Sequence, residues 1–325
     1  MFGRLLMGFA NILGQVKPLS IINAYIEGSA FSGGFIFSGP EGIGKLMTAK
    51  IIAQKLNCTS STDKPCGICE ACIKMEKLNH PDLHLIQNGD AQIKIEDIRL
   101  ILREASFRPY EGQMKVFIID NAHKLNIEAA NSLLKILEEP PKQSLIILIT
   151  HKPQSIIKTI LSRCKVIRFA PLERSSLQNI LTKNYFLDAS SAHFVAYYAE
   201  GRLGLALRLK DSLQLMEKNK IFDAFVLSQK PLDRSLATQN KEQLRSTLNI
   251  LAAWFRDLYL LKAGCSENEI INLDRKNDLL KLIPKFSFKQ LDDIVSSISE
   301  SMLYLEKNIN SKLLLHNLGA QLWKG

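Results

Sequence analysis

The stretch that decides the fold is Phe35-Ile-Phe-Ser-Gly-Pro-Glu-Gly-Ile-Gly-Lys45. A short apolar run, typical of a buried strand, leads into a glycine-rich turn, and a helical pattern follows through about Leu56. Glycines let backbone N–H groups wrap around a phosphate, the helix N-terminus adds partial positive charge, and Lys45 can reach the terminal phosphates. The pattern therefore predicts a phosphate-binding loop, and the alternative is a glycine-rich turn that binds nothing.

Two positions depart from the pattern of an active phosphate loop. A Ser or Thr after the lysine would ligate Mg²⁺, but this position is Leu46, which has no oxygen. Asp120 ends an apolar run, as an aspartate does when it holds Mg²⁺ through water, but Asn121 follows it where many P-loop ATPases have a glutamate base. An amide cannot accept a proton near neutral pH. We therefore expect a degenerate site that binds ATP or ADP weakly at best and does not hydrolyse it, built from Gly39, Gly42, Gly44, Lys45 and Asp120.

The first half of the chain alternates apolar runs with helical patterns. Such alternation, with many β-branched residues, indicates an α/β fold with a buried parallel sheet. Pro140-Pro141 should end the helix that begins at Ile127, because proline cannot continue the hydrogen-bond ladder. Besides 35–38, we expect strands at 83–87, 115–120, 145–150 and 166–169, and further helices at 95–104 and 127–139.

After residue 170 the strand signal fades and the pattern is helical almost to the end of the chain. Short helices are expected at 174–183 and 190–199, a break at 201–204, and a helix that stops near Gly264. We therefore expect three domains, over 1–170, 171–212 and 213–325. One helical stripe could be either core or an oligomer interface, and it consists of Leu244, Leu248, Leu251, Phe255 and Leu258.

Four cysteines crowd into a short segment, Cys58, Cys66, Cys69 and Cys72. Zn²⁺ prefers four tetrahedral sulfur ligands at about 2.3 Å, and two-residue spacers place neighbouring ligands on one turn. The spacing therefore predicts a structural zinc module over 58–72, with free thiols as the alternative. Four thiolates complete the coordination shell, so His80 and His84 are expected to be ordinary histidines and the metal to have no catalytic role.

The composition is that of a soluble globular protein with an excess of positive charge. The chain has 325 residues, 46% of them hydrophobic, and a formal net charge of +10. This excludes a disordered, collagen-like or disulfide-dense chain and favours an anionic partner such as nucleic acid or nucleotide. No apolar run approaches the ~20 residues of a membrane-spanning helix and no signal peptide is apparent, so a cytoplasmic location is expected.

Several of these segments together match a known family. The chain resembles the bacterial clamp-loader AAA+ proteins, well over about 1–215 and more weakly in the helical tail. The resemblance is carried by Ser38-Gly-Pro-Glu-Gly-Ile-Gly-Lys45, the cysteine cluster, Ile118-Ile-Asp-Asn-Ala-His123, Ala130-Asn-Ser-Leu-Leu-Lys-Ile-Leu-Glu-Glu-Pro-Pro141, Leu161-Ser-Arg-Cys164, Trp254-Phe-Arg-Asp257 and Asn308-Ile-Asn-Ser-Lys-Leu313. It implies a P-loop AAA+ domain, then a small helical lid and a helical collar for oligomerisation.

The departures indicate which member of the family this is. The motor subunits of this family, called gamma or tau, have Thr after the loop lysine, Glu after the strand-end aspartate, and an arginine in the lid. At the matching positions this chain has Leu46, Asn121 and Gly204. The family lends the arginine of Ser-Arg-Cys to the neighbouring subunit's nucleotide site, which implies that Arg163 is a finger acting in trans. The family also has a phosphate-sensing polar residue at Thr150. Its sensing role is doubtful in this chain, because Leu46 weakens Mg²⁺ ligation.

The favoured hypothesis is that this chain is a stator, a rigid subunit that does not hydrolyse ATP itself. It would form a complex with gamma/tau and delta-type subunits, and the complex would load the sliding clamp onto primed DNA. Two alternatives remain open. The first is an active ATPase motor subunit of the same family, against which Leu46 and Asn121 argue. The second is a zinc-bearing nucleic-acid-binding module with a vestigial phosphate loop, which would bind DNA tightly as an isolated chain with a steep salt dependence.

Overall fold

The chain divides into two compact units in the computed structural model. One comprises Met1–Leu172 with Arg202–Gly204, and the other Glu173–Gly201 with Leu205–Gly325. The structure describes residues 9, 12–28, 32–61, 64–89, 91–211, 218–227 and 241–306. Among these described residues, no helix is both long and apolar enough to cross a membrane.

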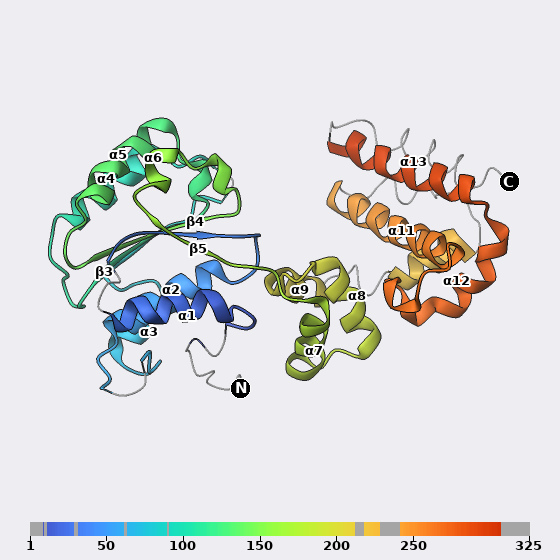
Figure 1. Cartoon of the computed structure of the whole chain (residues 1–325), viewed down its shortest axis with the longest axis horizontal. Helices are drawn as coiled ribbons and strands as arrows, with labels where there is room; N and C mark the ends of the chain where they lie inside the picture. Colours follow the sequence, from blue (N-terminus) through green and yellow to red (C-terminus); the bar gives the residue numbers. More distant parts are fainter. Residues whose placement is uncertain are drawn as a thin grey trace. The chain divides into compact units, whose positions relative to one another are not determined.

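A five-stranded, fully parallel sheet forms the centre of the first unit (Figure 1). The strands lie in the order β2-β3-β4-β1-β5, so β1 is flanked by strands that come much later in the sequence. All five predicted strands are confirmed to within two residues, as β1 (Gly33–Ser38), β2 (Leu83–Ile86), β3 (Lys115–Ile119), β4 (Ser144–Thr150) and β5 (Lys165–Arg168).

Helices cover both faces of this sheet, as Figure 1 shows. One face carries α1 (Val16–Glu27), α2 (Lys45–Asn57) and α3 (Glu70–Glu76), and the other carries α4 (Ile95–Ala105), α5 (Ile127–Glu138) and α6 (Lys158–Leu161). Side chains alternate along a strand. Phe35 and Phe37 therefore join the core on one face, Ile36 joins the core on the other, and all three are fully buried. The predicted α/β architecture is confirmed.

Helix α5 ends one residue before its predicted end, because Pro140 follows Glu139 and proline has no backbone N–H to donate. Three helices were not predicted, namely α1, α3 and α6. Helices α3 and α6 have only 7 and 4 residues, which is too short for a helical period to stand out.

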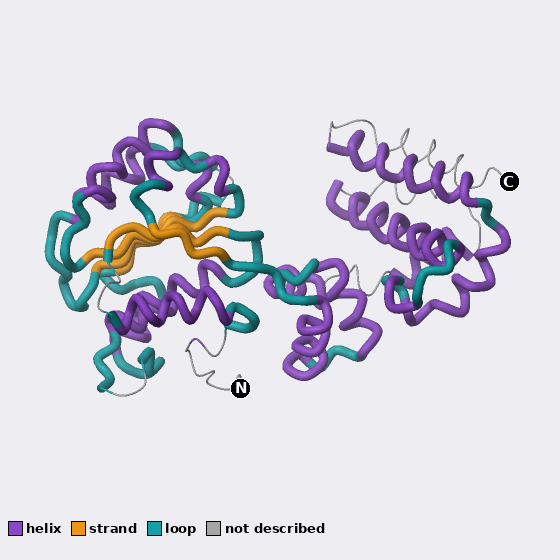
Figure 2. The backbone as a smooth tube through the Cα atoms, viewed as in Figure 1, coloured by secondary structure: helices purple, strands orange, loops and turns teal. Residues whose placement is uncertain are grey.

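The described residues of the second unit form helices joined by loops, with no strand among them (Figure 2). It contains α7 (Arg174–Tyr185), α8 (Ala189–Ala199), most of α9 (Leu203–Lys210), a π-helical segment (Phe222–Leu227), α11 (Lys241–Lys262), α12 (Lys276–Leu282) and α13 (Phe288–Glu306). The predicted stop is confirmed, since α11 ends two residues before Gly264, whose φ is +80°. The predicted boundary at residue 212 and the motif Asn308–Leu313 lie outside the described residues, and the division into lid and collar stays a prediction.

The apolar stripe of α11 lies in the core of this unit. All five of its residues are fully buried, and they pack together with Trp254 and with residues of α12 and α13. The stripe is therefore intramolecular core, which the sequence alone could not distinguish from an oligomer interface.

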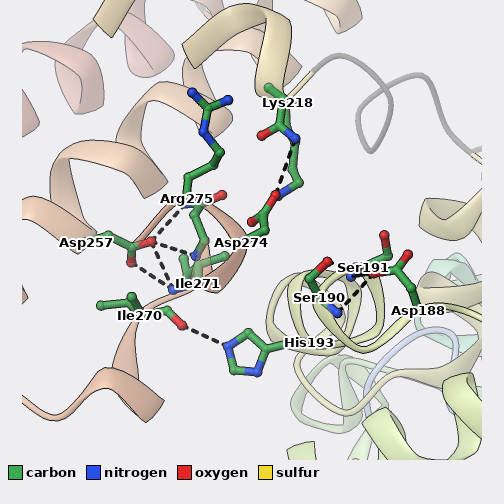
Figure 3. Close-up of polar contacts among 12 residues, drawn as sticks. Asp188, Ser190, Ser191, His193, Lys218, Asp257, Ile270, Ile271, Asp274 and Arg275 are labelled. Carbon is green, nitrogen blue, oxygen red and sulfur yellow. Dashed lines mark hydrogen bonds and ion pairs between the residues drawn. The ribbon is translucent and has the colours of Figure 1, made fainter. Parts of the chain in front are cut away.

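Buried polar contacts join segments of the second unit that lie far apart in the sequence (Figure 3). The carboxylate of Asp257, fully buried, accepts hydrogen bonds from the backbone N–H groups of Ile271 and Asn272 at 2.8–3.0 Å. His193 of α8 contacts the Ile270 carbonyl oxygen through Nε2 at 2.8 Å. These contacts hold the loop after α11 against both α11 and α8.

Replacing Asp257 with Ala should lower the free energy of unfolding by about 2–3 kcal/mol, because buried N–H donors lose their acceptor. Urea denaturation of the purified chain would measure this change. The matched control is Asp292→Ala, since Asp292 lies exposed on α13. Equal effects of the two substitutions would show that Asp257 does not hold the loop.

Candidate functional site

The phosphate loop joins β1 to α2 in a conformation that needs glycine. Gly39, Gly42 and Gly44 all have positive φ, and a Cβ on Gly39 would lie 2.3 Å from the carbonyl oxygen of Phe169. Lys45 Nζ donates to the carbonyl oxygens of Gly39 at 2.7 Å and Pro40 at 2.5 Å. Burial lowers the pKa of Lys45 to about 8, although the negative charges of Asp120 and Glu41 act to raise it. The loop therefore has the shape and the lysine expected of a phosphate site.

Two groups that an active phosphate loop uses, a hydroxyl that binds Mg²⁺ and a carboxylate base, are missing from this site. Leu46 is partly buried and packs against the core between α2 and the sheet. The Asp120 carboxylate, just after β3, accepts a hydrogen bond from the backbone N–H of Asn121 at 2.9 Å. Asn121 itself has a left-handed backbone, with φ +53°. Of these three residues, only Asp120 has a carboxylate; Leu46 has no side-chain oxygen, and the amide of Asn121 cannot serve as a base.

Thr150, at the end of β4, contacts two groups beside the loop. Its hydroxyl lies 3.3 Å from His123 Nδ1 and accepts a hydrogen bond from the backbone N–H of Lys152. The rings of His123 and His151 are 4.3 Å apart. Burial, with the positive charges of neighbouring residues, lowers the pKa of His123 to about 4, so this ring is neutral near pH 7. His151 belongs to no recognisable sequence motif, so its place beside the loop could not be predicted.

Gly204 lies directly on the phosphate loop. Its backbone N–H donates to the Gly42 carbonyl oxygen at 2.7 Å, and a Cβ on Gly204 would lie 2.8 Å from that oxygen. Any side chain at this position would therefore need the loop to shift. Arg202, two residues earlier, lines a pocket of about 850 Å³ beside the loop, together with Glu41, His151 and Arg168.

Arg163 and the phosphate loop lie at opposite ends of two neighbouring strands. The loop follows the carboxyl end of β1, whereas Arg163 precedes β5, and the two strands are parallel neighbours. Its side chain is 34% exposed and forms an ion pair with Glu138 at 2.8 Å. The structure therefore does not bring Arg163 to this chain's own loop, and the side chain is accessible from outside.

The four cysteines form a compact tetrad at the ends of α2 and α3. Their sulfur atoms lie within 4.8 Å of one another, and the Sγ atoms of Cys58 and Cys69 are 3.9 Å apart. A tetrahedron with arms of about 2.3 Å has edges of about 3.8 Å, so this donor set fits a zinc ion. No other group of three or more such ligands occurs within the described ranges.

Backbone N–H groups face three of the four sulfurs, whereas burial raises the pKa of the fourth thiol, Cys72. The N–H groups of Cys66, Cys69 and Cys72 each point at the sulfur of the preceding cysteine in the set, at 3.3–3.5 Å. Burial acts to raise the pKa of Cys69, but hydrogen bonds from Cys72 and Thr59 outweigh it and lower that pKa to about 6. A thiolate at neutral pH is the form that binds metal.

The two nearby histidines lie outside the tetrad. His80 Nδ1 accepts a hydrogen bond from the backbone N–H of Asp82, and the His84 ring stacks on Phe117 at 5.0 Å between centroids. Neither belongs to the group of candidate ligands. The structure thus separates three features: the degenerate phosphate loop, the cysteine tetrad and Arg163.

Comparison with known proteins assigns the chain to a family. A family model described as "DNA polymerase III, delta subunit" matches residues 14–173, and one described as the C-terminal part of that subunit matches 214–322. The chain is 28% identical to DNA polymerase III subunit delta' of Bacillus subtilis, over 96% of this chain and 97% of that protein. It is 35% identical to subunit tau of Escherichia coli, over 62% of this chain and 32% of that protein.

One solved structure, a gamma-subunit-related protein of Thermotoga maritima, aligns with 94% of this chain and 99% of its own, at 17% identity and a TM-score of 0.46. The two family models and the full-length match to the delta' subunit together span both units of the fold. The chain belongs to the family of DNA polymerase III clamp-loader subunits, and within it to the delta-prime type.

Proposed function

We propose that this chain is the non-hydrolysing stator subunit of a bacterial DNA polymerase III clamp loader, and that Arg163 acts at the nucleotide site of a neighbouring subunit. Its partners are subunits of the gamma/tau and delta types, and the assembly uses ATP to load the sliding clamp onto primed DNA. The observation that carries this proposal is a contrast within one domain. Leu46 and Asn121 remove the metal ligand and the base, whereas Arg163 is retained and accessible.

The chemistry of arginine suits this role. A guanidinium is always charged, and its N–H groups donate hydrogen bonds to phosphate oxygens. Supplied in trans, it stabilises the charge of the phosphoryl-transfer transition state, and such fingers contribute about 10³–10⁵ in rate in other NTPases. A subunit that cannot hydrolyse ATP itself can therefore still be needed for ATP hydrolysis at the site of the neighbouring subunit.

The isolated chain should show ATPase activity at background level, because phosphoryl transfer needs both metal neutralisation and a positioned water. A steady-state phosphate-release assay on the purified chain would measure this. Activity above background that is abolished by Lys45→Ala would contradict the stator role and favour an active motor of the gamma/tau type.

Nucleotide titration of the same chain should show weak binding that hardly depends on Mg²⁺, because Leu46 supplies no oxygen to the metal. Calorimetry with ATP, with and without Mg²⁺, would test this. Tight binding of Mg·ATP would mean that the site tolerates leucine at this position.

We also propose that the cysteine tetrad holds a structural Zn²⁺ through Cys58, Cys66, Cys69 and Cys72. The sulfur spacing and the backbone N–H groups that face the sulfurs support it. Since four protein ligands complete the shell, the ion would stabilise the segment between α2 and α3 and take no part in catalysis.

A further inference from the structure

The guanidinium of Arg163 is held by three residues. Its Nε donates to Glu138 Oε1 at 2.9 Å, and its Nη2 lies 2.8 Å from the same oxygen. Its Nη1 donates to the Thr159 carbonyl oxygen at 2.9 Å and to the Ser162 hydroxyl at 3.3 Å. A guanidinium has five N–H donors, so these contacts leave one Nη2 hydrogen without an acceptor among the described residues.

Glu138 occupies a place where an acidic side chain is unfavourable. It is the last residue of α5, and the C-terminal end of a helix carries partial negative charge. Basic residues are preferred there, so a glutamate is a local departure from the electrostatic rule. Such departures mark sites where function outweighs stability. Here the positive charge of Arg163 compensates the carboxylate.

The chain fixes the position of Glu138 independently of Arg163. Pro140 and Pro141 follow it and end the helix at this point, and the neighbouring Ile136 and Leu137 are buried in the core beneath α5. The carboxylate therefore projects from a rigid helix end. Side chains mounted on such elements hold functional groups more precisely than side chains on loops.

We infer that Glu138 is the positioning residue for Arg163. It fixes the plane of the guanidinium against the end of α6 and leaves one edge, with the remaining Nη2 hydrogen, for a phosphate oxygen of the neighbouring subunit's nucleotide. This inference rests on the proposed role of Arg163. It adds that the finger is oriented before the subunits meet, so that less side-chain entropy is lost at the transition state.

The test is the ATPase activity of the assembled clamp loader carrying Glu138→Ala. We expect kcat at the adjoining site to fall about 10-fold with KM unchanged. A misplaced guanidinium stabilises the transition state less well, whereas binding of ATP in the ground state hardly depends on it. Glu138→Gln keeps an oxygen acceptor on the same stem, so its kcat should stay within about 3-fold of wild type. The matched control is Glu139→Ala, which removes the exposed neighbouring carboxylate and should leave kcat unchanged.

A double-mutant cycle separates this inference from the proposed function. If Glu138 acts through Arg163, then Glu138→Ala should have no further effect in the Arg163→Ala background. An equal loss in both backgrounds, or a kcat for Glu138→Ala that matches wild type, would overturn the positioning role. If Arg163→Ala itself leaves the ATPase of the complex unchanged, the proposed function fails instead. The melting temperature of the isolated variant should match wild type, since exposed ion pairs contribute little stability.

Discussion

Replacing Arg163 with Ala should reduce ATP hydrolysis at the adjoining subunit's site by about 10³-fold or more, the range that removing an arginine finger has in other NTPases. The substitution removes a positive charge that would stabilise the transition state, so we expect a lower kcat. The measurement is the ATPase rate of the reconstituted complex, with and without the variant subunit, in the presence of clamp and primed DNA.

The Arg163→Lys variant tests the chemistry of the finger. It keeps a positive charge but lacks the planar guanidinium, so it should recover only part of the lost rate. The isolated Arg163→Ala chain should fold normally, because an exposed ion pair is worth about 0–1 kcal/mol. An unchanged ATPase rate in the complex would show that Arg163 is an ordinary surface cation.

Replacing Cys72 with Ser should release zinc and destabilise the first unit. Cys72 is fully buried and is one of the four proposed ligands, so its loss would leave an incomplete shell. A metal ion whose free concentration is 1,000 times its Kd stabilises a fold by about 4 kcal/mol. The variant should lose most of this stabilisation. Metal analysis and thermal unfolding, each with and without chelator, would measure both effects.

The matched control for this substitution is Cys265→Ser. Cys265 is exposed and lies outside the tetrad, so its replacement should change neither the metal content nor the melting temperature. Wild-type protein without stoichiometric zinc, or a melting temperature that chelator leaves unchanged, would contradict the zinc assignment.

Local features of this protein could be predicted from neighbouring residues. The strand before the phosphate loop and the end of α5 at the prolines follow from short-range rules of periodicity and backbone hydrogen bonding. The cysteine tetrad also follows from spacing, since three of its members are separated by two residues each. In each case the residues that decide the structure lie close together in the sequence.

Contacts between distant segments could not be predicted in this way. The hydrogen bond from Gly204 to Gly42 and the ion pair between Arg163 and Glu138 join residues that no local pattern relates. The one available signal for Glu138 was an acidic residue at a helix C-terminus. An acidic residue at this position is unusual, but the sequence does not indicate that Arg163 is the residue that pairs with it.

The sequence by itself determined which chemical groups this protein has: a lysine without a metal-ligating hydroxyl after it, an aspartate without a neighbouring base, four clustered thiols and one arginine in Ser-Arg-Cys. Only the tertiary structure decided where these groups lie. Because β1 and β5 run parallel, the phosphate loop and Arg163 lie at opposite ends of these neighbouring strands. Helix packing in the second unit buries the stripe of α11 in a core. The physical reason is that side-chain chemistry belongs to single residues, whereas strand order and packing depend on the burial of apolar surface by the whole domain.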